Sequence, residues 1–88
     1  MNDHVLLQIG KKIRTIRHAN SRPIQDVADR AGVSKGLISK IENGRTVPSL
    51  PVLLGIIKAL DTEIPVFFDG IEYIRYDGYR HKEAHEYE

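Results

Sequence analysis

The chain has 88 residues, 41% of them hydrophobic and 28% charged, which allows one small domain with a modest core and excludes a multidomain protein. The lack of cysteine excludes disulfides, thiolate metal sites and a cysteine nucleophile, and it fits a reducing cytoplasm. The sequence has neither a signal-peptide core nor an apolar run long enough to cross a bilayer, so it predicts a cytoplasmic protein without a membrane partner.

Charge is distributed unevenly around the net value of +1. Residues 1–60 hold ten Lys and Arg against four Asp and Glu, a balance of +6. Residues 61–88 hold three against eight, a balance of −5. This distribution favours a protein whose residues 1–60 contact the phosphates of a nucleic acid and whose residues 61–88 stay away from them.

The first predicted helix covers about Val5–Ala19, with Asp3 as its cap. Its apolar residues recur at helical spacing: Val5, Leu6, Ile9, Ile13 and Ile16. The polar stretch at residues 20–23 then breaks the helix and ends in a proline, which suits the first turn of a following helix. The second helix is therefore predicted over about Pro23–Ala31.

Residues 24–43 have the pattern of two short helices joined by a sharp turn. Ala28 is small enough for two helices to pack closely over it, and Gly32 follows where a positive φ ends the first helix. Ser34 can cap the second helix, which is predicted from Lys35 to Glu42 or Asn43 and is stopped by Gly44. The predicted apolar interior of this pair consists of Val27, Ala31, Val33, Ile38 and Ile41.

Two further helices complete the domain. Residues 45–48 are predicted to form a loop, and Ser49 can cap a strongly apolar helix over Leu50–Leu60, in whose first turn Pro51 is tolerated. A short fifth helix is predicted over Ile64–Phe68. The predicted fold is therefore all-α, a five-helix domain over residues 1–70 followed by a short tail.

Composition changes in the tail, residues 71–88, which holds all four tyrosines and no leucine. An Asp-Gly pair at residues 77–78 is a two-residue hairpin signal. That hairpin would place like charges, such as Arg75 and Arg80, opposite each other, which is unfavourable. Three descriptions of the tail stay open: a hairpin, a single β-strand that pairs across a dimer, and a disordered end.

Two stretches, VADRAGVSKGLISKIENGRTVPSL and LLGIIKAL, resemble the Cro/C1-type helix-turn-helix family, also called the XRE family, of phage repressors and bacterial regulators. The resemblance covers residues 5–68. It implies a phage-repressor-like fold and a transcriptional regulator that binds specific sequences of double-stranded DNA. The recognition helix, at about Lys35–Asn43, would lie in the major groove.

The resemblance also implies roles for single residues. Base contacts are assigned to Lys35, Gly36, Ser39 and Lys40. Phosphate contacts are assigned to Ser34, Asn43, Arg45, Thr46, Arg14 and Gln25. The chain departs from the family at Pro23, where a capping Ser or Thr is frequent, and at Ile24, where a phosphate-binding Gln is frequent. Gln25 stands one position later than that Gln.

Two interactions of the protein with itself follow from the same resemblance. Arg17 and Glu42 correspond to a structural ion pair that would tie the first helix to the recognition helix. A homodimer on an inverted repeat, associated with the nucleoid, is implied because small members commonly dimerise through the fourth and fifth helices or the segment after them. The dimerisation candidates are Phe67, Phe68, Ile71, Tyr73 and Tyr76.

Two other functions stay open on the sequence alone. The acidic, tyrosine-rich tail could wrap a protein partner, as in an antitoxin or another protein-interaction module. The chain could also be the DNA-binding fragment of a larger sensor regulator.

Metal binding and catalysis are not predicted. The chain has four histidines, His4, His18, His81 and His85. The last two stand in the order H-K-E-A-H, which lacks the H-E-x-x-H pattern of a general base beside two zinc ligands. No carboxylate pair or Ser/His pair has the setting of a catalytic site, so we expect no enzyme, no metal and no cofactor.

Overall fold

The computed structural model describes residues 3–72, and within this range the chain forms five α-helices and no β-strand. They are α1 (Asp3–Ala19), α2 (Ile24–Ala31), α3 (Lys35–Glu42), α4 (Leu50–Ala59) and α5 (Ile64–Phe68). The prediction of an all-α, five-helix fold is thereby confirmed. None of the described helices combines the length and apolar character that a membrane span requires. The hairpin or strand of the tail, Tyr73, Tyr76, His81 and His85 lie outside the described residues.

The predicted helix boundaries agree with the structure to within two residues. α1 begins at Asp3, so this residue belongs to the helix and does not precede it as a cap. α4 ends one residue earlier than predicted, at Ala59. Pro23 precedes α2 and does not lie in its first turn, and it makes no side-chain capping bond. α2 therefore begins without the polar cap that the next two helices have.

Two serines cap the helices that follow the turn. The Ser34 hydroxyl accepts a hydrogen bond of 3.0 Å from the backbone N–H of Leu37, and the Ser49 hydroxyl accepts one of 3.3 Å from that of Val52. Each bond caps an N–H in the first turn of its helix, and the Leu37 N–H also donates to the Ser34 carbonyl at 3.1 Å. The starts of α3 and α4 are thus set by local sequence, as predicted.

The turn between α2 and α3 is closed by Gly32, which has φ 72° and ψ 31°. Its N–H donates to the Asp29 carbonyl at 3.3 Å, and the next N–H, of Val33, donates to the Ala28 carbonyl at 3.0 Å. This pair of bonds is the Schellman ending of a helix, and glycine reaches the required left-handed conformation without a Cβ penalty. The sharp turn that the sequence predicted is therefore present.

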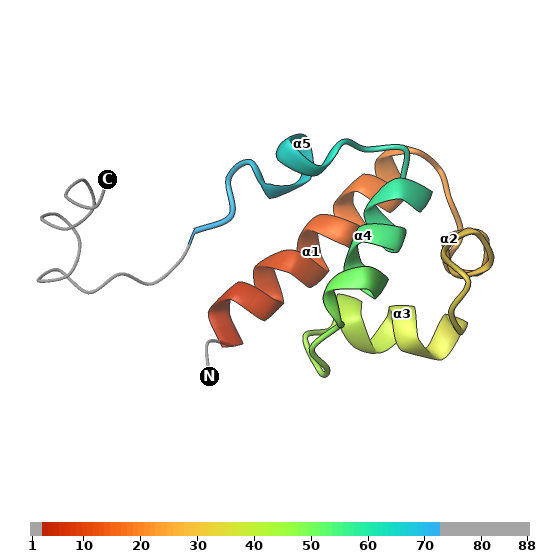
Figure 1. Cartoon of the computed structure of the whole chain (residues 1–88), viewed down its shortest axis with the longest axis horizontal. Coiled ribbons are helices and arrows are strands. Elements are labelled where there is room, and N and C mark those ends of the chain that lie inside the picture. The colour runs from red at the N-terminus through yellow and green to blue at the C-terminus, as the bar shows by residue number, and fades with distance from the viewer. Residues whose placement is uncertain (1–2, 73–88) are drawn as a thin grey trace, which may run out of the picture.

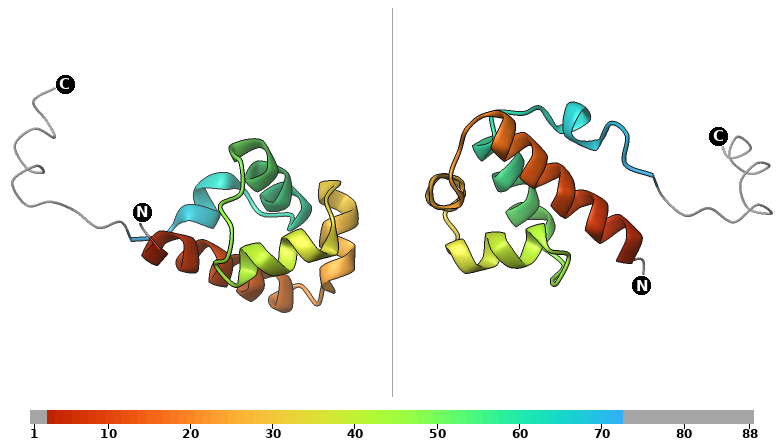
Figure 2. Two further views of the ribbon diagram at one scale, coloured as in Figure 1. Left: turned by 90° about the horizontal axis from the view of Figure 1, so that it is seen from below. Right: turned by 180° about the vertical axis from the view of Figure 1, so that it is seen from behind.

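The helices surround one core to which all five contribute (Figure 1). α1 packs on α3, α2 packs on both α3 and α4, and α5 packs on α4. The buried hydrophobic residues are Ile9, Ile13, Val27, Ala28, Ile38, Ile41, Leu53, Ile56, Ile57, Ala59, Leu60 and Phe67. Figures 1 and 2 show α3 and α5 on opposite sides of the domain. One long side of α3 is left at the surface.

The segment after α5 runs back against α1. The side-chain amide of Gln8 donates to the Glu72 carbonyl at 2.6 Å and accepts from the Glu72 N–H at 2.8 Å. Lys12 Nζ donates to the Asp69 carbonyl at 2.8 Å. These contacts attach the end of the described chain to α1.

Candidate nucleic-acid interface

The two sides of α3 have different compositions. Ile38, Ile41 and Glu42 are buried on the inner side. The predicted base-contacting residues lie on the other side: Lys35, Gly36 and Lys40 are exposed and Ser39 is half-buried. Figure 2 (left) shows α3 at the surface of the domain. The helix therefore presents two lysines, a serine and a glycine to the surroundings.

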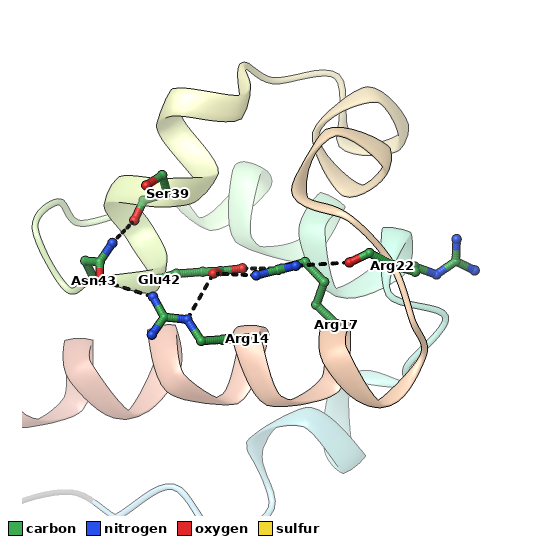
Figure 3. Close-up of polar contacts among 6 residues, drawn as sticks. All are labelled: Arg14, Arg17, Arg22, Ser39, Glu42 and Asn43. Atoms are coloured by element: carbon green, nitrogen blue, oxygen red, sulfur yellow. Dashed lines mark hydrogen bonds and ion pairs between the residues drawn. The ribbon is translucent and has the colours of Figure 1, made fainter.

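The only carboxylate of α3, that of Glu42, points inward and is neutralised (Figure 3). It is 5% exposed and accepts two hydrogen bonds from Arg17, from Nε at 2.7 Å and from Nη2 at 3.0 Å. Arg14 Nε donates a third bond at 3.3 Å. Charge-assisted, bidentate bonds of this kind are the strong ones. The structure thus joins Arg17 and Glu42, and it removes a negative charge from the outer surface of α3.

The same network continues to α2. Arg17 Nη1 donates to the backbone carbonyl of Arg22 at 3.0 Å, and the Arg22 side chain pairs with Asp26 at 2.7 Å and with Asp61. The hydrogen bond from Arg22, with a weaker one from Arg30, lowers the pKa of the Asp26 carboxyl below its ordinary value. The hydrogen bond with Asp26 in turn raises the pKa of Arg22. The positions of α1, α2 and α3 are therefore linked by ion pairs that one hydrogen bond to a backbone carbonyl connects.

Gly10 allows α1 to approach the end of α3 closely. A Cβ atom at this position would lie 2.4 Å from the Ile41 carbonyl oxygen and 2.6 Å from that of Glu42. Both are backbone atoms, so no side-chain rotation could relieve the contact. Sequence reasoning did not identify Gly10, although a glycine inside an amphipathic helix is a recognisable signal of close packing.

Two predicted phosphate-contacting residues contact each other. Arg14 Nη2 donates to Asn43 Oδ1 at 3.1 Å, and Asn43 Nδ2 donates to the Ser39 carbonyl at 2.9 Å (Figure 3). The Arg14 side chain is 44% exposed. A third candidate, Gln25, donates to Asp29 within its own helix at 2.8 Å. In the free protein these three side chains are occupied by the domain itself.

Three cations on or beside α3 have no such partner. Lys35, Lys40 and Arg45 are exposed, and none of them forms an ion pair with another residue of the described range 3–72. Arg45 follows Gly44, whose φ of 69° ends the helix, and its N–H donates to the Lys40 carbonyl at 2.9 Å. This bond fixes the backbone at Arg45 against the end of α3. The surface can therefore offer three positive charges to an anionic partner.

The structure corrects one of the predicted dimerisation candidates. The Phe67 side chain is 0% exposed and belongs to the core, so it is not available to a second subunit. Phe68 is half-buried, in an edge-to-face contact with the Phe67 ring at 5.1 Å between centroids, and Ile71 is also half-buried. The exposed large hydrophobic side chains of α5 are Ile64 and Val66.

Comparison with known proteins identifies the fold and the family. Residues 8–65 match the family described as Helix-turn-helix domain. The HTH-type transcriptional regulator SinR of Bacillus subtilis is 32% identical over 71 residues, 80% of this chain and 64% of that protein. The transcriptional regulator ClgR of Mycobacterium tuberculosis is 38% identical over 58 residues, 66% of this chain and 52% of that protein. The chain thus spans about half to two thirds of these curated relatives.

A solved structure gives the same result. The restriction-modification controller protein C.Esp1396I, crystallised as a tetramer in complex with its natural 35 base-pair operator, has a TM-score of 0.71 and 26% identity. The likeness covers 74% of this chain and 86% of that one. With the family match over residues 8–65, the chain belongs to the helix-turn-helix domain family, as its sequence indicated.

Proposed function

We propose that the protein binds specific sequences of double-stranded DNA through α3 and regulates transcription. The observation that carries this proposal is the charge on the outer side of α3. Lys35, Lys40 and Arg45 are exposed and unpaired within the described range, whereas the carboxylate of Glu42 is buried and neutralised. Cations held in this way attract phosphate and can donate to guanine in the major groove. The names of SinR and ClgR and the operator complex of C.Esp1396I support the proposal.

The contacts divide into two groups. We assign Lys35, Ser39 and Lys40 to base edges, with Gly36 among them, because their side of α3 would face the floor of the groove. We assign Arg45 and Thr46 to phosphates, together with Ser34 at the start of the helix.

Three of the residues predicted to contact phosphates differ from the others: Arg14, Asn43 and Gln25. Each already has a protein partner, so each would contact a phosphate only by exchanging a bond within the protein for one to DNA. Their net contribution to affinity should therefore be smaller than that of Arg45.

We further propose a homodimer on an inverted repeat, acting at the nucleoid in the cytoplasm. The tetrameric assembly of C.Esp1396I on its operator supports self-association. α5 offers a surface for it, since Ile64 is 46% exposed and Val66 is 58% exposed. An open groove of about 420 Å³, lined by Leu54, Ile57, Ile64 and Pro65 among others, could receive apolar side chains of a second copy. Of the candidates named earlier, Phe68, Ile71, Tyr73 and Tyr76 stay in this proposal.

Selection of bound sequences from a random DNA pool tests both proposals. The full 88-residue chain is used at about 150 mM salt, where weak non-specific binding is screened. An enriched inverted repeat with half-sites about ten base pairs apart is the expected result. A folded, helical chain that enriches no sequence would contradict specific DNA binding. A single enriched half-site without a repeat would contradict the dimer alone.

A further inference from the structure

Gly36, in the first turn of α3, is a glycine that no described part of the molecule requires. A Cβ atom built there would meet only the Ser34 hydroxyl oxygen, at 4.0 Å, which is ordinary contact. Its φ lies outside the left-handed region. Alanine would therefore fit at this position, and the Ser34 cap would stay intact.

Two other glycines near α3 differ from Gly36 in this respect. Gly10 is required by space, because a Cβ atom would lie 2.4 Å from a backbone oxygen of α3. Gly44 is required by conformation, because its φ is 69°. The fold itself thus explains Gly10, which faces α3 from α1, and Gly44, which follows α3. It does not explain Gly36 on the outer side of α3.

A glycine in a helix has a thermodynamic cost. Its backbone loses more conformational freedom on folding than that of alanine, so it is among the poorest helix formers after proline. Nothing inside the described domain compensates this cost at Gly36, which points to a compensating contact outside the domain. Gly36 is exposed, it directly follows Lys35, and it stands one helical turn before Ser39 and Lys40.

We propose that Gly36 is a specificity-determining residue: its missing side chain lets the first turn of α3 lie against the base edges of the major groove. This inference rests on the proposed function and deepens it. At this point the helix backbone itself contacts the base pair, so base pairs are selected by steric fit, whereas Lys35 and Lys40 select by hydrogen bonds. A methyl group added at residue 36 would hold the helix away from the groove floor and weaken the neighbouring contacts as well.

Gly55 provides a matched control. It lies inside α4 with a φ outside the left-handed region, and a Cβ atom there would meet only the Ala31 carbonyl oxygen, at 3.9 Å. Gly55→Ala and Gly36→Ala should therefore both leave the fold intact. Each should raise the midpoint of thermal unfolding, by up to a few degrees, through the better helix propensity of alanine.

DNA binding should separate the two variants. The parent chain first provides its selected sequence, and the affinities of all variants for that sequence and for random DNA are then measured. Gly55→Ala should bind as the parent does. Gly36→Ala should bind the selected sequence about tenfold more weakly, with little change on random DNA, and Gly36→Leu should lose more. The opposite signs of the stability and affinity changes exclude unfolding as the cause.

Each other outcome has a distinct meaning. A parent chain that enriches no sequence contradicts the proposed function itself. If the parent is selective but Gly36→Ala binds the selected sequence equally well, the close approach at Gly36 is wrong. If Gly36→Ala weakens binding to selected and random DNA by the same factor, the contact is with the DNA backbone and base selection by Gly36 is wrong.

Discussion

The inner and outer sides of α3 differ in the contacts that their polar residues make. On the inner side, Glu42 is fixed by two bonds from Arg17 and one from Arg14, and Gly10 brings α1 against the last turn. On the outer side, Lys35 and Lys40 have no ionic partner within the described residues. Polar groups on the inner side bond to other residues of the protein, whereas the lysines of the outer side can bond to a partner.

This difference separates orientation from recognition. A helix that contacts base edges must keep a fixed position, since small displacements break directional hydrogen bonds. The side-chain hydrogen bonds from α1 to the end of α3 are made to Glu42 and Asn43, and none of them is made to a residue assigned to bases. Substitutions on the inner side should therefore act through stability, and substitutions on the outer side should act through binding.

The largest effect is expected from Arg17→Ala. Loss of this arginine leaves the buried carboxylate of Glu42 with only the longer bond from Arg14, at 3.3 Å. Breaking a buried ion pair typically costs about 3–5 kcal/mol of unfolding free energy, so urea denaturation followed by circular dichroism should show a loss of that size. The control is Lys35→Ala, an exposed position expected to stay within about 0.5 kcal/mol of the parent. Equal losses in the two variants would contradict the separation of the two sides.

Gly10→Ala should have the next largest effect. The added methyl group meets the backbone oxygens of Ile41 and Glu42, and overpacking of this kind costs about 1–3 kcal/mol. Gly55→Ala adds the same methyl group where space exists and is the control in the same denaturation experiment. If Gly10→Ala unfolds at the denaturant concentration of the parent, α1 does not approach α3 as closely as described.

On the outer side, Lys40→Ala and Arg45→Ala should differ in kind. Lys40→Ala should lose about 1–3 kcal/mol of binding to the selected sequence and accept other bases there. Arg45→Ala should weaken binding to all sequences alike and reduce the slope of log affinity against log salt concentration by about 1. Affinities measured at several salt concentrations on selected and random DNA distinguish the two. Equal loss of specific and random binding by Lys40→Ala would contradict its assignment to a base.

Sequence was sufficient where structure depends on neighbours in the chain. The caps at Ser34 and Ser49 and the turn at Gly32 depend on residues at most four positions away, and all three are present. Contacts between distant segments are different. The close approach at Gly10 and the bond from Arg14 to Asn43 depend on how α1 crosses α3, which no local pattern determines.

The correction at Phe67 has a similar origin. A five-residue helix is too short for its periodicity to show which side is buried, so Phe67 and Val66 look alike in the sequence. Only the position of α5 on α4 assigns Phe67 to the core and Val66 to the surface.

The smallest effect is expected at Asp26, a half-buried residue at the far end of the ionic network. Arg22 lowers the pKa of the Asp26 carboxyl in the folded state. The ion pair therefore stabilises the fold at pH values above the unfolded-state pKa, about 3.9. This stabilisation is lost as the pH falls through the folded-state pKa. Since ion pairs that water still reaches contribute little to stability, Asp26→Asn should be only slightly less stable than the parent at pH 7. That margin should shrink below about pH 4 in unfolding curves measured at several pH values. In an Arg22→Gln background the margin should be smaller and less dependent on pH. A margin that stays constant into strong acid would mean that Asp26 acts through packing rather than charge.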